Sequence, residues 1–573
     1  MNLRHATPVL AISALMAACA DDPEPVFEAP EEENRHLNIL YWQAVSIVNP
    51  YLSGGTKDIE AASMVIEPLA HYDENGGMTP VLAAEIPTLE NGGVAEDLRS
   101  ITWKLKTDVL WSDGTPFTAH DVAFSGAYCL DEQAGCASLA SFADVTAVEA
   151  IDDHTVRITF QVAKPWPYGP FVGSLSPIIQ REQFQDCLGT RAQECTEQNF
   201  GPIGTGPFKV DDFRANDVIN YSANELYREP GKPWFRTATF KGGGDAASAA
   251  RAVLETGEYD YAWNLQVEPE VLEQMVAAGK GQVLMGFGSQ VERLMVNQTN
   301  DDSNLGDRRS LYLDGTNAHP FLSDPAVRRA LSLAIDRQVL VDTGYGAAGR
   351  TTCNIVPAPV PYASVANEAC KIPDPAEANR ILDQAGWVRG QDGVRAKDGV
   401  RLSILYQTST NSVRQGTQAL IKQMWEAIGI ETELRNIDAA VFFGADPASP
   451  DTFQKFYADV QMYTNNFQGT DPEVYMAGWV CARNPGPHNQ WLGTNIPRGC
   501  SDEFDALVEE LSITPPGEDR SRIGKRLNDI IVQEQFMIPL IWRAAVSARS
   551  NSLKGVRMNP WDSELWNIAD WHR

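Results

Sequence analysis

Short strand patterns alternate with helical patterns along most of this chain, and this alternation constrains its fold more than any other feature. Residues 101–106 and 156–162 alternate between apolar and polar side chains, as half-buried strands do. Residues 36–45 read as a strand that runs into a loop, and residues 119–127 and 412–428 as helices. No repeat of solenoid period is visible. The pattern therefore predicts a mixed α/β (α+β) fold, and 573 residues predict two to four domains or sub-domains.

Two of the expected helices begin with an aspartate followed by a proline. Asp324 is expected to cap a helix over 325–340, with Arg328 and Arg329 facing outward. A second helix, over 375–385, begins at the same kind of pair and ends at a glycine. Further strands are expected at 402–406 and 430–434.

The first twenty residues have the composition of an export signal. Arg4 precedes an apolar stretch that is too short to span a membrane, and two alanines then precede Cys19. This arrangement resembles a bacterial lipoprotein signal, in which residues 1–18 are removed and Cys19 is lipidated. The alternative is an ordinary secretory signal in which Cys19 has no role. Both readings predict export to the bacterial cell envelope, and the first predicts a lipid-anchored protein, periplasmic or on the outer face of the cytoplasmic membrane.

The segment that follows is too acidic and too rich in proline to pack. Residues 21–34 hold seven acids and three prolines, so we expect residues 19–35 to form a solvated, disordered tether. The whole chain has 46 basic and 76 acidic residues, a formal charge of −30. This balance argues against nucleic acid and anionic membrane surfaces as partners. We expect contact with a membrane only through the lipid anchor.

Eight cysteines remain after Cys19, and they fall into four close pairs. Because an even number in an exported protein indicates disulfides, we expect four local bridges, although eight cysteines allow 105 connectivities. No C-x2-C spacing is present and the eight histidines are scattered, so we expect no metal site and no cofactor. The expected pairs are Cys129/Cys136, Cys187/Cys195, Cys353/Cys370 and Cys481/Cys500.

The densest motif is ITWKLKTDVLWSDGTPFTAHDVAFS at residues 101–125, a strand, a tight turn at Asp113-Gly114 and a helix that Thr118 caps. It resembles the signature of the dipeptide/oligopeptide-binding proteins of ABC importers, the family 5 solute-binding proteins. Similar stretches follow in the order expected for that family, and the resemblance extends from about residue 36 to the C-terminus. They include residues 204–209, 224–227, 254–260 and 500–507.

The resemblance implies a two-lobed, periplasmic-binding-protein-like fold (type II, cluster C) with an extra inserted sub-domain. Ligand would stabilise the closed form, because only that form brings both lobes into contact with it. The hinge would consist of strands at 293–297 and 538–542. The implied parts are lobe I at 36–80, 204–290 and 540–573, the insertion at 81–203, and lobe II at 291–539.

The resemblance also places the ligand between the lobes, at strand ends that face the cleft. In peptide binders of this family, an aspartate in one cleft loop pairs with the peptide's ammonium group. The matching stretch here holds Asn465 and Asn466, and its first acid is Asp471, which weakens the assignment of a peptide. The residues expected to contact ligand are Trp42, Trp263, Asn264, Thr410, Asn411, Asn465, Asn466, Phe467 and Asp471.

The implied function is capture of di- or oligopeptides by a monomer that delivers them to the permease and ATPase subunits of an ABC importer. Two alternatives keep the same fold: a non-peptide solute such as an oligosaccharide, opine or metal chelate, or a binder that reports to a sensor. A secreted hydrolase is the rival outside this family. Fourteen tryptophans and many carboxylates would suit a glycosidase, but neither G-x-S-x-G nor H-E-x-x-H occurs.

Overall fold

Two mixed sheets form the framework of the part of the chain that the computed structural model describes, residues 35–444, 446–465, 467 and 469–573. Cys19, residues 1–18, all but the last residue of the expected tether, and Asn466 lie outside the described residues. Within the described ranges, no helix has both the length and the apolar character that crossing a membrane requires.

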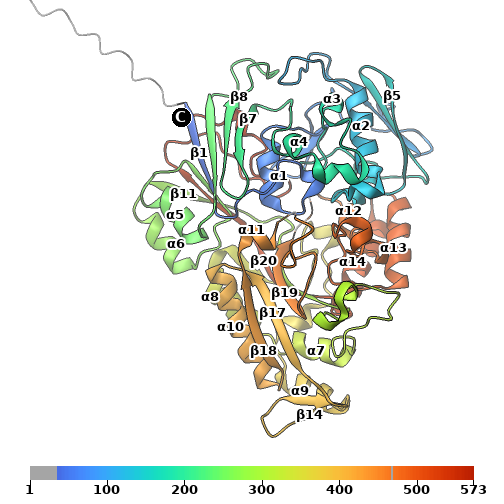
Figure 1. Cartoon of the computed structure of the whole chain (residues 1–573), viewed down its shortest axis with the longest axis vertical. Helices are drawn as coiled ribbons and strands as arrows, with labels where there is room; N and C mark the ends of the chain where they lie inside the picture. Colours follow the sequence, from blue (N-terminus) through green and yellow to red (C-terminus); the bar gives the residue numbers. More distant parts are fainter. Residues whose placement is uncertain (1–34, 445, 466, 468) are drawn as a thin grey trace, which may run out of the picture. The chain divides into compact units, whose positions relative to one another are not determined.

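The first sheet has seven strands, with β1 at its centre (Figure 1). β1 pairs in parallel with β9 and β10, and the outer pairs are antiparallel. Helix α5 (Ala246–Leu254) packs against β10, β11 and β21. In sheet order the strands are β11 (Gly281–Gly286), β21 (Ala545–Ser550), β10 (Tyr261–Trp263), β1 (His36–Tyr41), β9 (Thr237–Gly242), β8 (Val218–Ala223) and β7 (Phe208–Arg214).

A small antiparallel sheet between β3 and β7 in the sequence carries the densest motif. Its central strand, β6, pairs with both neighbours. Gly114 has a φ of 90° in the tight turn, and the Asp113 carboxylate accepts from the backbone N–H of Thr115 at 2.9 Å. The backbone N–H of Thr118 donates to Asp121 at 2.9 Å, which confirms the predicted start of α2. We call residues 81–207 the small-sheet region, and its elements are β4 (Ser100–Lys104), α2 (Ala119–Leu130), β5 (Val145–Asp152), β6 (Thr155–Phe160), α3 (Arg181–Phe184) and α4 (Thr196–Phe200). Before it, β2 (Ala70–Tyr72) and β3 (Met78–Pro80) form a separate two-stranded sheet.

The second sheet has six strands, and β12 and β20 are adjacent in it. Helices α8 and α10 lie along it, against β20 and β18 respectively (Figure 1). The expected lobe boundary at residue 540 falls inside β20. In sheet order the strands are β13 (Gly349–Thr351), β20 (Met537–Arg543), β12 (Val291–Val296), β19 (Val460–Asn465), β17 (Ser403–Ser409) and β18 (Glu431–Ile437).

The remaining elements are helices and one small ribbon. The helices are α1 (Thr56–Ser63), α6 (Pro269–Val276), α7 (Pro325–Leu333), α8 (Arg337–Gly344), α9 (Pro375–Gln384), α10 (Ser412–Ala427), α11 (Ala439–Phe442), α12 (Glu473–Ala477), α13 (Asp502–Ile513) and α14 (Glu518–Gln533). A three-stranded ribbon comprises β14 (Val388–Arg389), β15 (Arg395–Lys397) and β16 (Val400–Arg401).

The helix predicted over 325–340 is wrong in length, because it is two helices. Asp324 caps α7 as expected, but Asp336 caps a second helix, α8, by accepting from the backbone N–H groups of Gln338 and Val339. The outward orientation predicted for Arg328 is also wrong. Its side chain is buried and donates to the backbone oxygens of Leu322, Ser323 and Glu534. These carbonyls replace water as its hydrogen-bond partners.

The core of the first sheet continues into the small sheet without a break. One cluster of buried side chains includes Leu37 and Ile39 from β1 together with Trp103, Trp111 and Phe160. The second sheet has a separate core against α7 and α10, and a further cluster lies among α12, α13 and α14. The small sheet is thus attached to the first sheet by shared apolar burial.

The four predicted disulfides are all present. They join Cys129 to Cys136, Cys187 to Cys195, Cys353 to Cys370, and Cys481 to Cys500. Their sequence separations are 7, 8, 17 and 19 residues, so each closes a short loop.

Replacing both cysteines of the Cys353–Cys370 pair by alanine should lower the free energy of unfolding by about 3 kcal/mol. Without the bridge, the unfolded chain regains the conformational entropy of a 17-residue loop. Removing the 7-residue Cys129–Cys136 bridge should cost about 2 kcal/mol by the same reasoning. Urea denaturation of the two double variants measures both values. An equal or larger loss for the shorter loop would show that native packing, not loop entropy, sets the effect.

Candidate ligand-binding cleft

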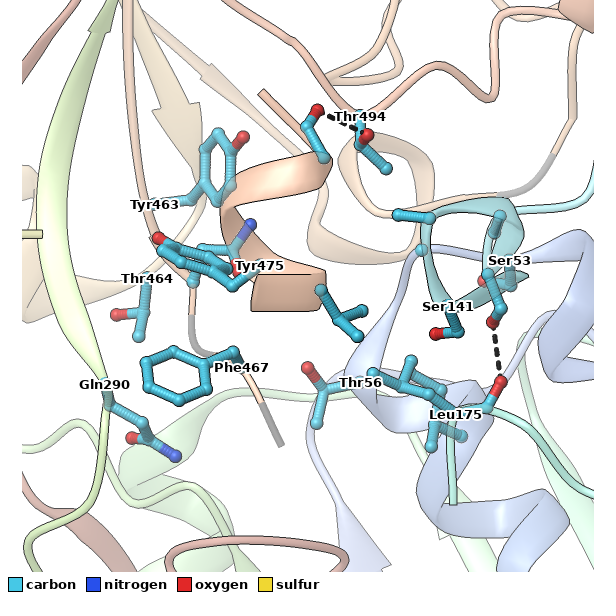
Figure 2. A pocket seen from close by; sticks show the side chains of 18 of the residues that line it. Ser53, Thr56, Ser141, Leu175, Gln290, Tyr463, Thr464, Phe467, Tyr475 and Thr494 are labelled. Atoms are coloured by element: carbon cyan, nitrogen blue, oxygen red, sulfur yellow. Dashed lines mark hydrogen bonds between the residues drawn. The ribbon is translucent and has the colours of Figure 1, made fainter. Parts of the chain in front are cut away.

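A cavity of about 270 Å³ lies between residues of the first sheet, the small-sheet region and the second sheet, and we call it the cleft. Figure 2 shows Tyr463, Phe467 and Tyr475 on one side of it, and Ser53 and Ser141 on the other. Residues from β10, α1, the loops of the small-sheet region, β19 and α12 contribute to one lining. The cleft is therefore built from segments more than 400 residues apart in the sequence.

Aromatic rings make up much of the lining, especially beside β19 and α12. Phe467 and Tyr475 have ring centroids 5.2 Å apart, and Tyr475 and Trp479 lie 5.5 Å apart, edge to face. Tyr475 and Trp479 are four residues apart and so fall on the same side of the short helix and its extension. Such rings suit a ligand with flat or apolar parts. The aromatic lining residues are Tyr72, Trp166, Tyr168, Trp263, Phe443, Phe453, Tyr463, Phe467, Tyr475 and Trp479.

Two arginines of the lining share one buried carboxylate. Arg414 Nε lies 2.9 Å from Glu292 Oε1, and Arg543 lies 4.0 Å from the same carboxylate. Burial disfavours the charged form of Glu292, but these guanidinium groups outweigh it and hold the pKa of Glu292 below its usual range. Thr464 also donates to Glu292. Two positive charges and one negative charge leave this part of the cleft with a surplus of positive charge.

The end of β10 presents an aromatic residue and an amide to the cleft. Trp263 stacks on Tyr41 with ring centroids 4.6 Å apart and planes 5° from parallel. Asn264 follows with a φ of 56°, and its side-chain oxygen accepts from Arg543. This left-handed conformation ends the strand and turns the Asn264 side chain toward the second sheet. Trp42 donates from its indole nitrogen to the backbone oxygen of Asn264 at 2.9 Å.

Asp471 lines the cleft, but Arg520 occupies its carboxylate. Arg520 Nε and Nη2 each lie 2.7 Å from one Asp471 oxygen, and the Tyr362 hydroxyl donates to the same group at 3.1 Å. Arg520 Nη2 also lies 2.6 Å from Glu473, whose other oxygen lies 2.5 Å from Lys164 Nζ. Asp471 therefore belongs to a buried ionic network that joins α12 and α14 to the small-sheet region.

Glu60 in α1 is a second carboxyl of the lining. It accepts from the Ser563 hydroxyl and from the backbone N–H groups of Glu564 and Leu565. Burial, reinforced by the nearby Glu564 carboxyl, raises the pKa of Glu60 to about 8. Glu60 is therefore mostly protonated at neutral pH and brings little negative charge to the cleft.

The structure brings five of the predicted ligand-contact residues together in the cleft: Trp263, Asn264, Asn465, Phe467 and Asp471. The other described ones lie outside its lining. Trp42 packs in the core beside α5, Thr410 is exposed, and Asn411 is buried as the cap of α10. Asn466 lies outside the described residues.

Sequence reasoning missed much of the lining. The small-sheet region contributes Ser138, Ser141, Trp166 and Tyr168, and the C-terminal segment contributes Arg543. The only signal for any of these was the Trp-Pro-Tyr run at 166–168, where aromatic residues and prolines cluster without strand or helix periodicity. The positions of Glu60, Arg414 and Arg543 depend on pairing between distant segments.

The described residues hold one group with the composition of a metal site, Asp301, His319 and Asp459, and none of the three lines the cleft. His319 Nδ1 accepts from the backbone N–H of Leu322 at 3.0 Å, so Nε2 carries the proton. Nε2 then donates to Asp459 at 2.7 Å. A metal-bound histidine normally donates from its other nitrogen, and Nδ1 cannot do so here. His319 and Asp459 thus form a buried hydrogen-bonded pair, and the Asp301 carboxylate lies 3.9 Å from His319 Nε2.

The family model described as "Bacterial extracellular solute-binding proteins, family 5 Middle" matches residues 77–491. The chain belongs to this family. The match covers the densest motif, the small sheet and most of the cleft lining.

Individual relatives and solved structures agree with this family assignment. The chain is 24% identical over 550 residues to the glutathione-binding protein GsiB of Escherichia coli O1:K1, covering 96% of this chain and 94% of GsiB. The oligopeptide-binding protein AppA of Bacillus subtilis, solved with a nonapeptide, has a TM-score of 0.78 at 20% identity, over 94% of this chain and 98% of AppA. NikZ of Campylobacter jejuni, solved with Ni(L-His), has a TM-score of 0.77 at 21% identity, over 94% and 100%. The two structures show that the predicted two-lobed α/β fold is right.

Between about pH 4.5 and pH 8, the folded protein keeps the Glu60 proton, whereas the unfolded chain releases it above its ordinary pKa of 4.5. The free energy of unfolding should therefore fall as the pH rises through this range. The slope should be about 1 kcal/mol per pH unit. In Glu60→Gln this contribution should disappear, whereas Glu225→Gln, a change at an exposed position, should keep it. Urea denaturation at pH 5, 6, 7 and 8 measures the slopes, and equal slopes in all three proteins would contradict the assignment.

Asp471→Asn should lower the free energy of unfolding by about 3 kcal/mol, because it leaves part of the buried Arg520 charge without a partner. Asp519→Asn removes a carboxylate from an exposed ion pair with Arg522 and should change stability by less than about 1 kcal/mol. Thermal and urea unfolding of both variants test this. If Asp471→Asn is as stable as the parent, the fold does not depend on the Asp471–Arg520 pair, and the Asp471 carboxylate would be available for ligand binding.

Proposed function

We propose that this chain is the extracytoplasmic solute-binding component of an ABC importer, which captures a small solute in the cleft by closure of two lobes and delivers it to the permease. One observation carries the proposal: the cleft is lined jointly by residues of both large sheets and encloses aromatic and polar side chains from each. A ligand that contacts both sides stabilises the closed arrangement over any open one.

The relatives leave the chemistry of the solute open, and the volume of the cavity limits its size. GsiB is named for glutathione, AppA was solved with a nonapeptide and NikZ with a nickel–histidine complex. The cavity of about 270 Å³ favours a small solute such as a short peptide or a compound of similar size. Peptide capture is thus one form of the proposed function, and capture of a non-peptide solute is the other.

The proposed lobes correspond broadly to the two sheets, with the boundary at residue 540 falling inside β20. Lobe I comprises the first sheet, residues 36–80, 204–290 and 540–573, with the insertion at 81–203, and lobe II comprises 291–539. Strands β12 and β20 carry the chain between the lobes and act as the hinge. The proposal further includes export by residues 1–18, a lipid anchor at Cys19, a monomeric state and the absence of catalysis.

Thermal unfolding of the body from residue 31 onward, against di- to hexapeptides, oligosaccharides, opines and nickel chelates, tests the proposal. A solute present at about 100 times its dissociation constant should stabilise the body by about 2.7 kcal/mol. Ser141→Trp should remove this stabilisation, because the indole fills the cleft from the small-sheet side. Ser323→Trp, at an exposed position, should retain it. Stabilisation that survives Ser141→Trp would place the binding site elsewhere, and no stabilisation by any solute class would contradict the function.

A further inference from the structure

Arg293 in β12 lies fully buried against the aromatic wall of the cleft. Its Nη1 donates to the Tyr475 hydroxyl, and its guanidinium carbon lies 5.7 Å from the Tyr475 ring centroid and 5.2 Å from that of Trp479. Its cross-strand neighbour in β19 is Tyr463. Tyr463, Tyr475 and Trp479 all line the cleft. The groups closest to this buried charge are thus the side chains that a bound solute would touch.

The Arg293 guanidinium has no counter-charge in the part of the chain that the structure describes. Among the described residues, no carboxylate lies within ion-pair distance of Arg293, and its Nε and Nη2 atoms have no hydrogen-bond acceptor. The buried hydroxyl of Tyr463 has no partner there either. Other fully buried arginines differ: Arg337 and Arg498 direct their nitrogens at backbone oxygens. A buried charge without a counter-charge is unfavourable, so this one points to an anionic partner that comes from outside the chain.

The vacant donors have the geometry that carboxylates use elsewhere in this protein. Arg520 binds Asp471 through Nε and Nη2, both at 2.7 Å, and Arg414 binds Glu292 through the same two nitrogens. The same edge of Arg293 is vacant. Two parallel N–H groups on a planar guanidinium match the two oxygens of a carboxylate.

The charges beside β12 and β20 favour an anion. Arg414 and Arg543 already exceed Glu292 in charge. The described lining has three carboxyl groups, Glu60, Asp471 and Asp562, and each of their six oxygens already accepts at least one hydrogen bond. Those bonds come from Ser563, Glu564 and Leu565 to Glu60, from Arg520, Tyr362 and Glu473 to Asp471, and from Tyr72, Ser174 and Ser563 to Asp562.

We propose that the solute carries a carboxylate and no free ammonium group, and that this carboxylate binds the Nε–Nη2 edge of Arg293 beside the Tyr463 hydroxyl. Arg293 itself does not line the cleft, so the Tyr475 or Trp479 side chain turns aside to admit the carboxylate. The inference rests on the proposed solute-binding function and narrows its ligand class. An ammonium group would share the cleft with Arg414 and Arg543, and each carboxyl oxygen of the described lining already accepts a hydrogen bond.

Matched charge forms of one skeleton test the ligand class. The probes are Ala-Phe, N-acetyl-Ala-Phe, Ala-Phe amide and N-acetyl-Ala-Phe amide, joined by the broader solute panel and measured by thermal unfolding and calorimetry at pH 7.5. We expect stabilising solutes to be carboxylates without an ammonium group, bound at least about 10-fold more tightly than their amides. A preference for amine-bearing forms, or tight binding of a neutral solute, overturns the inference but leaves the solute-binding function intact. No binding by any probe overturns the function and the inference with it.

Arg293→Met tests the residue itself. Affinity for the carboxylate solute should fall about 10- to 100-fold, while the ligand-free variant should stay about as stable as the parent, because the removed charge had no counter-charge among the described residues. Arg251→Met, at an exposed ion pair with Glu255, makes the same change in net charge and should leave affinity unchanged. If Arg293→Met does not fold, Arg293→Lys keeps the charge without the two-pronged edge and should bind more weakly than the parent. Parent-like affinity in whichever Arg293 variant folds overturns the assignment.

Discussion

The buried ionic network around Glu473 joins the two sides of the cleft. Lys164, from the small-sheet region, lies between Asp144 at 2.9 Å and Glu473 at 2.5 Å, and Glu473 shares Arg520 with Asp471. The side chains of Lys164, Glu473 and Arg520 are almost fully buried, so each depends on the others for its charge partner. Since α12 carries Glu473 as well as Tyr475, the aromatic wall of the cleft is placed by this network.

This network also explains why an acid in the cleft need not be a ligand group. Asp471 is the first acid after the cleft strand β19 and lines the cavity, but it lies beyond Asn465 and Asn466, which stand where the resemblance places the aspartate of peptide binders. Its two oxygens are instead taken by Arg520, which lies 49 residues further along the chain. The sequence predicted correctly that Asp471 lies in the cleft. Whether its charge is available to a ligand depends on Arg520, which the sequence did not reveal as its partner.

The sequence could predict the features that depend on neighbouring residues. The caps at Thr118, Asp324 and Asp374 and the four cysteine pairs all lie within about 20 residues of their partners, and all were predicted. The break at Asp336 was missed because apolar spacing continues through it, although aspartate is itself a capping residue. The environments of Glu60, Arg293 and Arg328 could not be predicted, because each is set by segments brought together only by folding.

The place of β21 in the first sheet has a consequence for how this chain reaches its folded state. β21 lies between β10 and β11, and the residues after it, Glu564 and Trp571, are buried against α1 and β10 in the same half of the molecule. The central strand of this sheet, β1, comes from the first residues of the body, whereas β21, which completes the sheet, comes from the last thirty residues. A chain that is exported from its N-terminus therefore cannot complete the first sheet until its end has crossed the membrane. Throughout transit its N-terminal half exposes unpaired strand edges, and protection from aggregation in that interval must come from outside the sheet.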